Sequence, residues 1–150
     1  MKLTDKWFTA LSEAENGQMV FINGRDDIAD FVRSGKFKER AEVTWRYEAD
    51  AKGMPDDDTA KLMEEVQLAL QKAMEKDKLS IMTGVYTGDG ERTLVFITRN
   101  VPAFGERLNQ ALAPFPLLPI TIYTEKDPQN EEYLDMLEMK NASGEEDDDI

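Results

Sequence analysis

The 150-residue chain contains no cysteine and no histidine. Without cysteine it can form no disulfide, no thiol nucleophile and no iron–sulfur cluster. Without histidine it lacks the commonest general base near neutral pH, the usual partner of a catalytic serine and the commonest metal ligand. A structural zinc site of the usual Cys/His type is excluded. We therefore expect no cofactor, no metal site and no catalytic residues, and an enzyme is the less favoured interpretation.

Long apolar runs are also missing. No segment approaches the roughly 20 apolar residues of a membrane span. Residues 1–15 carry charges throughout, unlike the apolar centre of a secretory signal. We therefore expect a cytoplasmic protein with no membrane partner.

Positive charge is scarce, since 18 Lys and Arg stand against 31 Asp and Glu and the net charge is −13. The stretch EEDDD at 145–149 supplies five of the negative charges. Such a surface repels phosphate backbones and attracts basic surfaces. We expect no direct contact with nucleic acid and a protein partner that presents a basic surface.

The hydrophobic periodicity predicts alternating strands and helices. Asn-Gly inside ENGQ is typical of a two-residue turn, so residues 7–25 should form a β-hairpin. Along the rest of the chain, the spacing of apolar residues switches between a period of two, typical of strands, and a period of 3.6, typical of helices. We expect strands at 41–49, 79–86, 92–98 and 118–124, and helices at 26–35, 56–78, 102–115 and 127–139.

The order of these elements from 41 to 124 is β-α-β-β-α-β, with short loops and two amphipathic helices. This order predicts an α+β fold, a ferredoxin-like split β-α-β core with helices on one face of an antiparallel sheet. The N-terminal hairpin and the C-terminal helix are additions to that core. We expect one domain over residues 1–140 and an acidic disordered tail over 141–150.

TGDG at 87–90 could cradle a phosphate or turn the chain between two strands. A phosphate loop opens a helix, whereas TGDG precedes the predicted strand 92–98. We therefore predict a hairpin turn in which Gly88 and Gly90 are structural. If this end of the sheet does bind a small ligand or an anion, the candidate residues are Asp89, Arg92 and Arg99.

Trp45 and Tyr47 lie on the only apolar face of strand 41–49. Exposed aromatics on such a strand would suit the stacking of RNA bases, but an apolar face is more often covered by helices. We predict that both side chains are core residues beneath the two helices. Strand 92–98 is apolar on both faces, so the N-terminal hairpin, the closing helix or another subunit should cover its second face.

Four stretches together resemble a bacterial family known as domain of unknown function 695. They are EVTWRYE, TGVYTGDGER, RNVPAFGERLNQAL and ITIYTEKDPQNEEY, and the likeness spans residues 41–133. The sequence differs from the family pattern in its aliphatic strand RTLVFIT and in Asn130, where the family pattern has tryptophan. Some members look fused to a domain similar to ribonuclease E inhibitor B, itself acidic and ferredoxin-like. The resemblance implies a protein that binds and regulates another protein.

Three hypotheses about function follow. The leading one is a non-catalytic cytoplasmic interaction or regulatory domain that acts through an acidic surface. A second copy of the chain is a further candidate partner, which would make a homodimer. The second is a small-ligand or anion-binding module, or a hydrolase, that uses Arg92 and Asp89. The third is an acidic immunity or mimic protein that blocks a basic nuclease surface.

Overall fold

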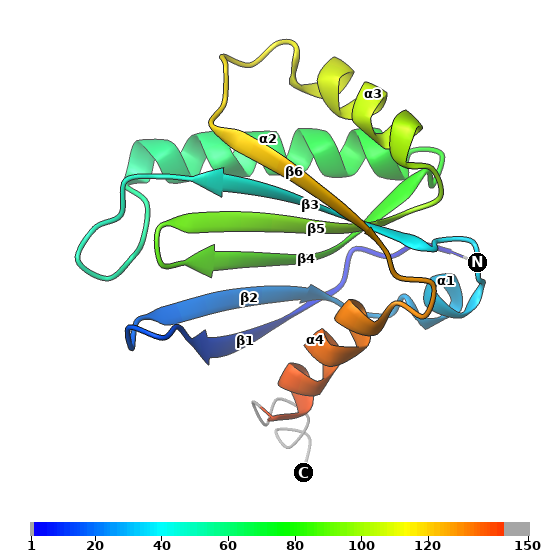
Figure 1. Ribbon diagram of the computed structural model, residues 1–150, viewed down its shortest axis with the longest axis horizontal. Helices are drawn as coiled ribbons and strands as arrows, with labels where there is room; N and C mark the ends of the chain where they lie inside the picture. The colour runs from blue at the N-terminus through cyan, green and yellow to red at the C-terminus, as the bar shows by residue number, and fades with distance from the viewer. Residues whose placement is uncertain (1, 143–150) are drawn as a thin grey trace.

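A computed structural model describes residues 2–142 as an antiparallel sheet of six strands with four helices (Figure 1). The strand order is β1-β2-β4-β5-β3-β6, and every neighbouring pair is antiparallel. The chain is therefore α+β, as predicted. The strands are β1 (Trp7–Glu13), β2 (Met19–Arg25), β3 (Glu39–Arg46), β4 (Ser80–Gly88), β5 (Glu91–Thr98) and β6 (Ile120–Lys126).

The helices are α1 (Ala29–Arg33), α2 (Asp57–Glu75), α3 (Val101–Leu112) and α4 (Glu131–Ala142). Side-chain caps start the two long core helices, since Asp56 Oδ1 accepts from Thr59 N at 2.7 Å and Asn100 Oδ1 accepts from Ala103 N at 2.9 Å. Such caps satisfy amide groups that have no partner within the helix. The helices therefore begin where the sequence places a short polar acceptor.

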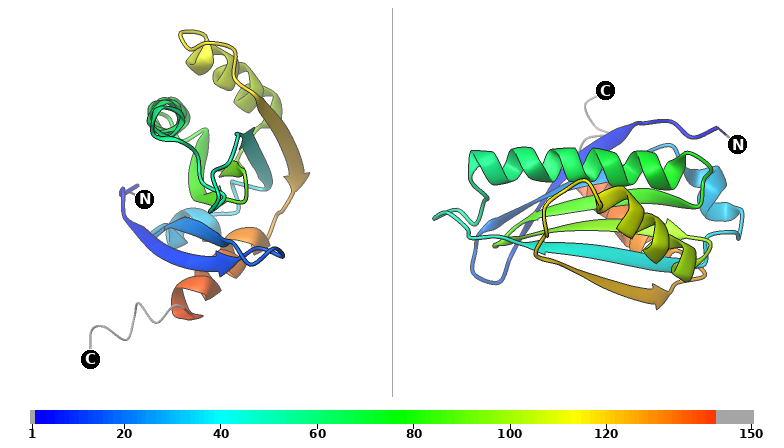
Figure 2. Two further views of the ribbon diagram at one scale, coloured as in Figure 1. Left: turned by 90° about the vertical axis from the view of Figure 1, so that its left-hand side faces the viewer. Right: turned by 90° about the horizontal axis from the view of Figure 1, so that it is seen from above.

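Helices α2 and α3 cover one face of the sheet (Figure 2). Trp45 is buried there, with 7% of its surface exposed, and this confirms the predicted inner face of β3. Tyr47 lies half-buried at the edge of the same core, and its hydroxyl donates to Gly53 O at 2.7 Å. The core combines apolar side chains of three strands with the inward stripes of both helices, including Val43, Met63, Val66, Leu70, Met74, Leu94, Phe96, Phe104 and Leu108.

The second face of the sheet is partly covered by α1 and α4 (Figure 2). Ile97 of β5 is buried there against Phe31 of α1, Phe37 in the loop after α1, and Tyr133 of α4. The prediction that something covers the second face of this strand is confirmed, and the closing helix supplies part of the cover. The cover is incomplete, because a hollow remains between the hairpin and α4.

The N-terminal hairpin extends the sheet, because β2 pairs with β4. Arg25 at the end of β2 is 1% exposed and donates to both carboxylate oxygens of Glu75 on α2, at 2.8 and 3.0 Å. It also donates to Thr4 O and Met82 O and lies over the Trp7 ring. A buried arginine with all its donors engaged thus ties the hairpin to α2.

At the C-terminus α4 continues to Ala142, two residues beyond the predicted end of the domain at 140. The rest of the predicted tail, residues 143–150, lies outside the described residues. No helix among residues 2–142 is long and apolar enough to cross a membrane.

Candidate functional site

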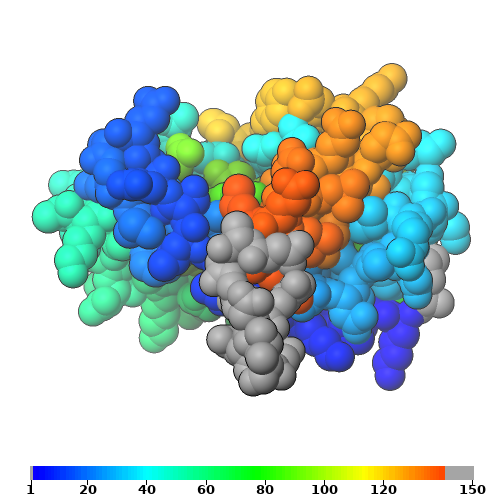
Figure 3. Space-filling view, turned by 90° about the horizontal axis from the view of Figure 1, so that it is seen from below, coloured from blue at the N-terminus to red at the C-terminus, as the bar shows by residue number. Residues whose placement is uncertain are grey.

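A hollow of about 390 Å³ opens on the second face of the sheet, between the hairpin and α4 (Figure 3). Thr93 and Val95 of β5 and Tyr86 of β4 line it from the sheet. Val20 lines it from the hairpin. The remaining lining residues are Ala14, Glu42, Gly88, Asp89, Glu91 and Glu132.

The β4–β5 turn closes one end of the hollow. Gly88 pairs with Glu91, so Asp89 and Gly90 form a two-residue turn, and both have positive φ, 53° and 80°. Positive φ at both positions is the geometry of a type I′ hairpin turn. The predicted turn is confirmed. Gly88 allows close approach to the hairpin, because a Cβ there would lie 2.7 Å from Met19 O.

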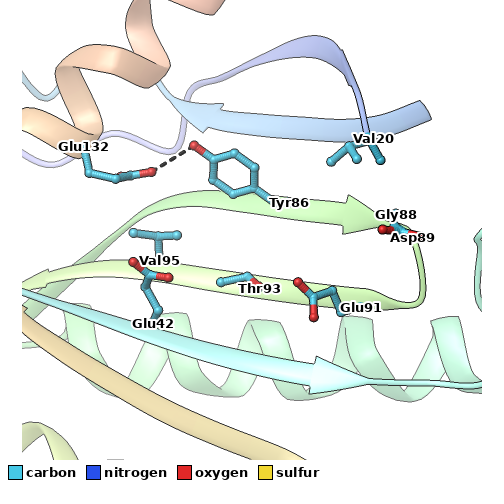
Figure 4. A pocket seen from close by; sticks show the side chains of 10 residues that line it. Val20, Glu42, Tyr86, Gly88, Asp89, Glu91, Thr93, Val95 and Glu132 are labelled. Atoms are coloured by element: carbon cyan, nitrogen blue, oxygen red, sulfur yellow. Dashed lines mark hydrogen bonds between the residues drawn. The ribbon is translucent and has the colours of Figure 1, made fainter. Parts of the chain in front are cut away.

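Tyr86 and Glu132 meet at the other end of the hollow. The Tyr86 hydroxyl donates to Glu132 Oε1 at 2.9 Å (Figure 4). Burial raises the pKa of the Glu132 carboxyl, although the hydrogen bond from Tyr86 and the charge of Arg40 act in the opposite direction. Burial and the neighbouring Glu132 charge raise the pKa of Tyr86 as well. Glu132 is thus a carboxylate held in the hollow with too little positive charge around it.

Arg40 is the guanidinium whose charge acts on Glu132, and it is already engaged. Its Nε donates to Glu42 at 2.8 Å, Nη1 donates to Asp127 at 3.3 Å, and Nη2 pairs with Glu125. Three carboxylates thus share one cation. This side of the sheet therefore keeps an excess of negative charge.

The two remaining carboxylates of the hollow lie at the turn. Asp89 Oδ1 accepts from Asn16 Nδ2 of the hairpin at 2.8 Å. Glu91 is half-buried, and it takes part in none of the ion pairs found among residues 2–142. Glu42 and Glu91 approach the hollow from β3 and β5 and lie on either side of Thr93 (Figure 4). Four separate elements therefore direct carboxylates toward one concave surface.

The three residues predicted to bind a ligand do not converge. Asp89 is in the turn beside the hollow, whereas Arg92 lies on the helix-covered face next to Trp45 and Met63. Arg92 donates to Thr87 Oγ1 at 2.9 Å and pairs with Glu64 at 4.0 Å. Arg99, beyond the other end of β5, lies over the Phe37 ring at 5.1 Å. Seven residue steps of extended chain place the two arginines about 24 Å apart.

The hollow is suited to holding a cationic group of another molecule. Carboxylates form the strongest hydrogen bonds with guanidinium and ammonium donors, and the Tyr86 ring offers a face for cation–π contact. Among residues 2–142, no three carboxylates are arranged so that they could hold a metal ion. Lysine and arginine side chains carry cationic groups of this kind.

The residues of the hollow other than Asp89 and Gly88 were not predicted as a site. The alternation of β3 does place Glu42 on the face opposite Trp45, and this was a usable signal. For Tyr86 the alternation was no guide, because a register shift between Met82 and Gly84 interrupts it in β4. Nothing in the sequence indicated that Glu132 would join the site, because its position depends on how α4 packs against the sheet.

Comparison with known proteins adds one match. The profile of a family of unknown function, DUF695, matches residues 5–138. No curated protein and no solved structure matches the chain. The match covers the hairpin, the helix-covered core and most of α4, so all the residues that line the hollow lie within it.

Proposed function

The chain belongs to the DUF695 family, and on that premise we propose that it is a non-catalytic, cytoplasmic protein-interaction or regulatory domain. It acts through the acidic hollow on the second face of the sheet. Its partner is a protein that presents lysine or arginine side chains on an exposed surface.

One observation carries the proposal, namely that Glu42, Asp89, Glu91 and Glu132 share a hollow with no free cation among its lining residues. Arg40, whose charge acts on Glu132, is already shared by Glu42, Glu125 and Asp127. A basic side chain that entered the hollow would supply the missing charge. It would also favour the ionised form of Glu132, which burial disfavours.

The shape of the hollow supports a long basic side chain as the inserted group. Val20 and the ring of Tyr86 offer apolar surface for the methylene stem, while the carboxylates lie around it. Lysine and arginine bury their stems in this way and keep the charged head among polar groups.

The alternatives differ in how well the contacts support them. A nuclease-blocking protein would use the same acidic hollow, so it is a special case of the proposal. An anion-binding module or hydrolase built on Arg92 and Asp89 would need Arg92 to leave Thr87 and Glu64. No described contact favours that rearrangement.

We also propose that β3, α2, β4, β5, α3 and β6 form a ferredoxin-like split β-α-β core. The support is the strand order β4-β5-β3-β6, with α2 and α3 as the two crossover helices on one face. The hairpin extends this core at the β4 edge.

The test of function is binding of a fluorescent hexa-arginine peptide, followed by anisotropy at physiological salt. The double variant Glu91→Gln/Glu132→Gln removes two charges from the hollow. The matched control Asp58→Asn/Glu65→Gln removes two from exposed positions on α2, on the other face of the sheet. We expect the hollow variant to weaken binding several-fold more than the control, because buried charges are screened less than exposed ones.

Equal losses for the two double variants would mean that the peptide responds only to net charge, and would overturn the role of the hollow. Once a physiological partner is known, the same pair of variants should be measured against it. A partner that binds the hollow variant as tightly as the control would refute the proposal in its own setting.

A further inference from the structure

The sheet has a free edge at β6. This strand is the last in the sheet, and it forms the outermost element along one side of the molecule (Figure 2, right). Residues 121–126 are all exposed. Unpaired edges are templates for pairing with another strand, and proteins commonly cover or charge them for that reason.

The backbone groups of β6 that point outward can be identified from two hydrogen bonds. Arg46 N donates to Pro119 O at 3.4 Å, and Asp127 N donates to Lys38 O at 2.8 Å. Bonded and non-bonded pairs alternate along an antiparallel ladder, so Thr121, Tyr123 and Glu125 bond to β3. The residues between them, Ile122, Thr124 and Lys126, therefore point their N–H and C=O groups away from the sheet.

The side chains at this edge are uncharged over most of its length. ITIYT at 120–124 is rich in residues that favour strands, and Ile122 and Tyr123 are 47% and 54% exposed. An adjoining groove of about 500 Å³ lies between α3, the loop after it and β6. No charged side chain lines the groove, and Leu117 beside it is fully exposed. In a chain with 33% charged residues, such a surface is distinctive.

We infer that β6 pairs antiparallel with β6 of a second copy of this chain, about a twofold axis perpendicular to the sheet. The strand's own register favours a second copy as the occupant, because β6 can pair with itself over all seven residues without setting like charges opposite each other, and charge selects this place. Two copies that each carry a net charge of −13 repel one another, so a self-contact requires an edge without excess negative charge. Glu125 and Lys126 offset each other at the end of β6, and Glu125 is also paired with Arg40.

One register pairs all seven residues of the strand. It sets Ile120 opposite Lys126 of the second copy and places Tyr123 on the axis. Glu125 then lies opposite Thr121 of the second copy, so no like charges face each other. The two sheets become continuous, and the acidic hollow of each copy stays open, since no residue of β6 lines it. The inference is therefore independent of the proposed function.

Sedimentation velocity of the full chain, from low micromolar to near-millimolar concentration, tests the association. We expect a concentration-dependent species of twice the 17.1 kDa chain mass. Ile122→Pro should abolish it, because proline removes an outward N–H while the bonds to β3 are kept. Ile122→Val keeps that N–H and should still dimerise. If Ile122→Pro fails to fold by circular dichroism, Thr124→Pro serves the same purpose.

The register is tested separately by disulfide cross-linking. Because the native sequence has no cysteine, an introduced cysteine can cross-link only to its copy in the second chain. Tyr123→Cys should cross-link rapidly under mild oxidation, because non-bonded antiparallel pairs have Cα atoms about 4.5 Å apart, within disulfide range. Leu68→Cys on α2, at a site that is 62% exposed, is the control and should cross-link slowly. A monomer at every concentration, a dimer insensitive to both proline variants, or equal cross-linking of the two cysteine variants would overturn the inference.

Discussion

Glu132 combines a functional position with a cost in stability. Burial raises the pKa of its carboxyl, so the folded state favours the protonated form. Its contribution to stability is present below the usual glutamate pKa of about 4.3 and is lost as pH rises through the raised value. At neutral pH the ionised group therefore destabilises the fold.

We predict that Glu132→Gln raises the melting temperature at pH 7, because glutamine can still accept from the Tyr86 hydroxyl without carrying a charge. The gain should shrink as pH falls through the raised pKa of Glu132 and should be absent below about 4. Thermal melts between pH 3 and pH 8 measure this, with exposed Glu131→Gln as the control. A lower melting temperature at pH 7 would show that the charged hydrogen bond outweighs burial.

Arg25 is the buried residue whose removal should matter most for stability. It is 1% exposed and holds Glu75, whose side chain is 11% exposed. Arg25→Met would leave Glu75 with only Met82 N and Gln71 as donors. Breaking a buried ion pair from one side costs about 3–5 kcal/mol, and we expect a loss of that size in urea unfolding.

The double variant Arg25→Met/Glu75→Leu provides the matching test. It removes both charges, so it should recover part of the stability lost in Arg25→Met. If the double variant is as unstable as the sum of the two single variants, then packing around the arginine, and not charge, is what stabilises the hairpin.

At the scale of elements, an ion pair joins the two helices of the core. Arg107 on α3 donates to Asp77, just beyond the end of α2, at 2.9 Å, and to Ala73 O at 3.2 Å. The hydrogen bonds from Arg107 lower the pKa of Asp77 to about 2. A lowered pKa contributes stability above the usual aspartate value, and this is lost as pH falls toward 2.

We predict that Asp77→Asn destabilises the protein at pH 7 by about 1 kcal/mol or less, because the pair is largely exposed to solvent. The difference from the unmodified chain should vanish near pH 2. Denaturant unfolding across this range measures it, with Glu106→Gln on α3 as a control of equal charge change. A difference that persists unchanged at pH 2 would mean that the ion pair is not its source.

At the scale of the whole molecule, the acidity has a kinetic consequence. The chain has a net charge of −13, and without the five acidic residues at 145–149 it would be −8. Charge of this kind accelerates encounter with a basic partner. The effect weakens as salt rises, because the Debye length falls from about 10 Å at 0.1 M to about 3 Å at 1 M.

We predict that the association rate with a basic partner falls as salt rises, and that a chain ending at Ala142 shows a smaller salt dependence. Stopped-flow or surface-based kinetics over a salt series measure both slopes. A chain ending at Ser143, which also lacks the five acids, should match the one ending at Ala142. An association rate that depends neither on salt nor on these acidic residues would mean that the charge serves only to keep the protein soluble.

Local patterns in the sequence determined the elements and their inner faces. The period of two in β3 was sufficient to place Trp45 inside, and the Asp-Gly pair was sufficient for the turn at 89–90. Both depend on backbone preferences and side-chain alternation over a few residues, so they can be read without knowing the neighbours. The order of strands and helices likewise established an α+β fold.

Only the tertiary structure decided which polar groups meet. Glu42, Tyr86 and Glu132 come from three elements far apart in the sequence, and their meeting depends on strand order, register and the docking of α4. The same holds for Arg25 and Glu75, whose separation in sequence hides a direct bond. Arg92 and Arg99 show the converse, since residues close in sequence are carried apart by an extended strand. Convergence of side chains is a property of long-range packing, and a local pattern cannot encode it.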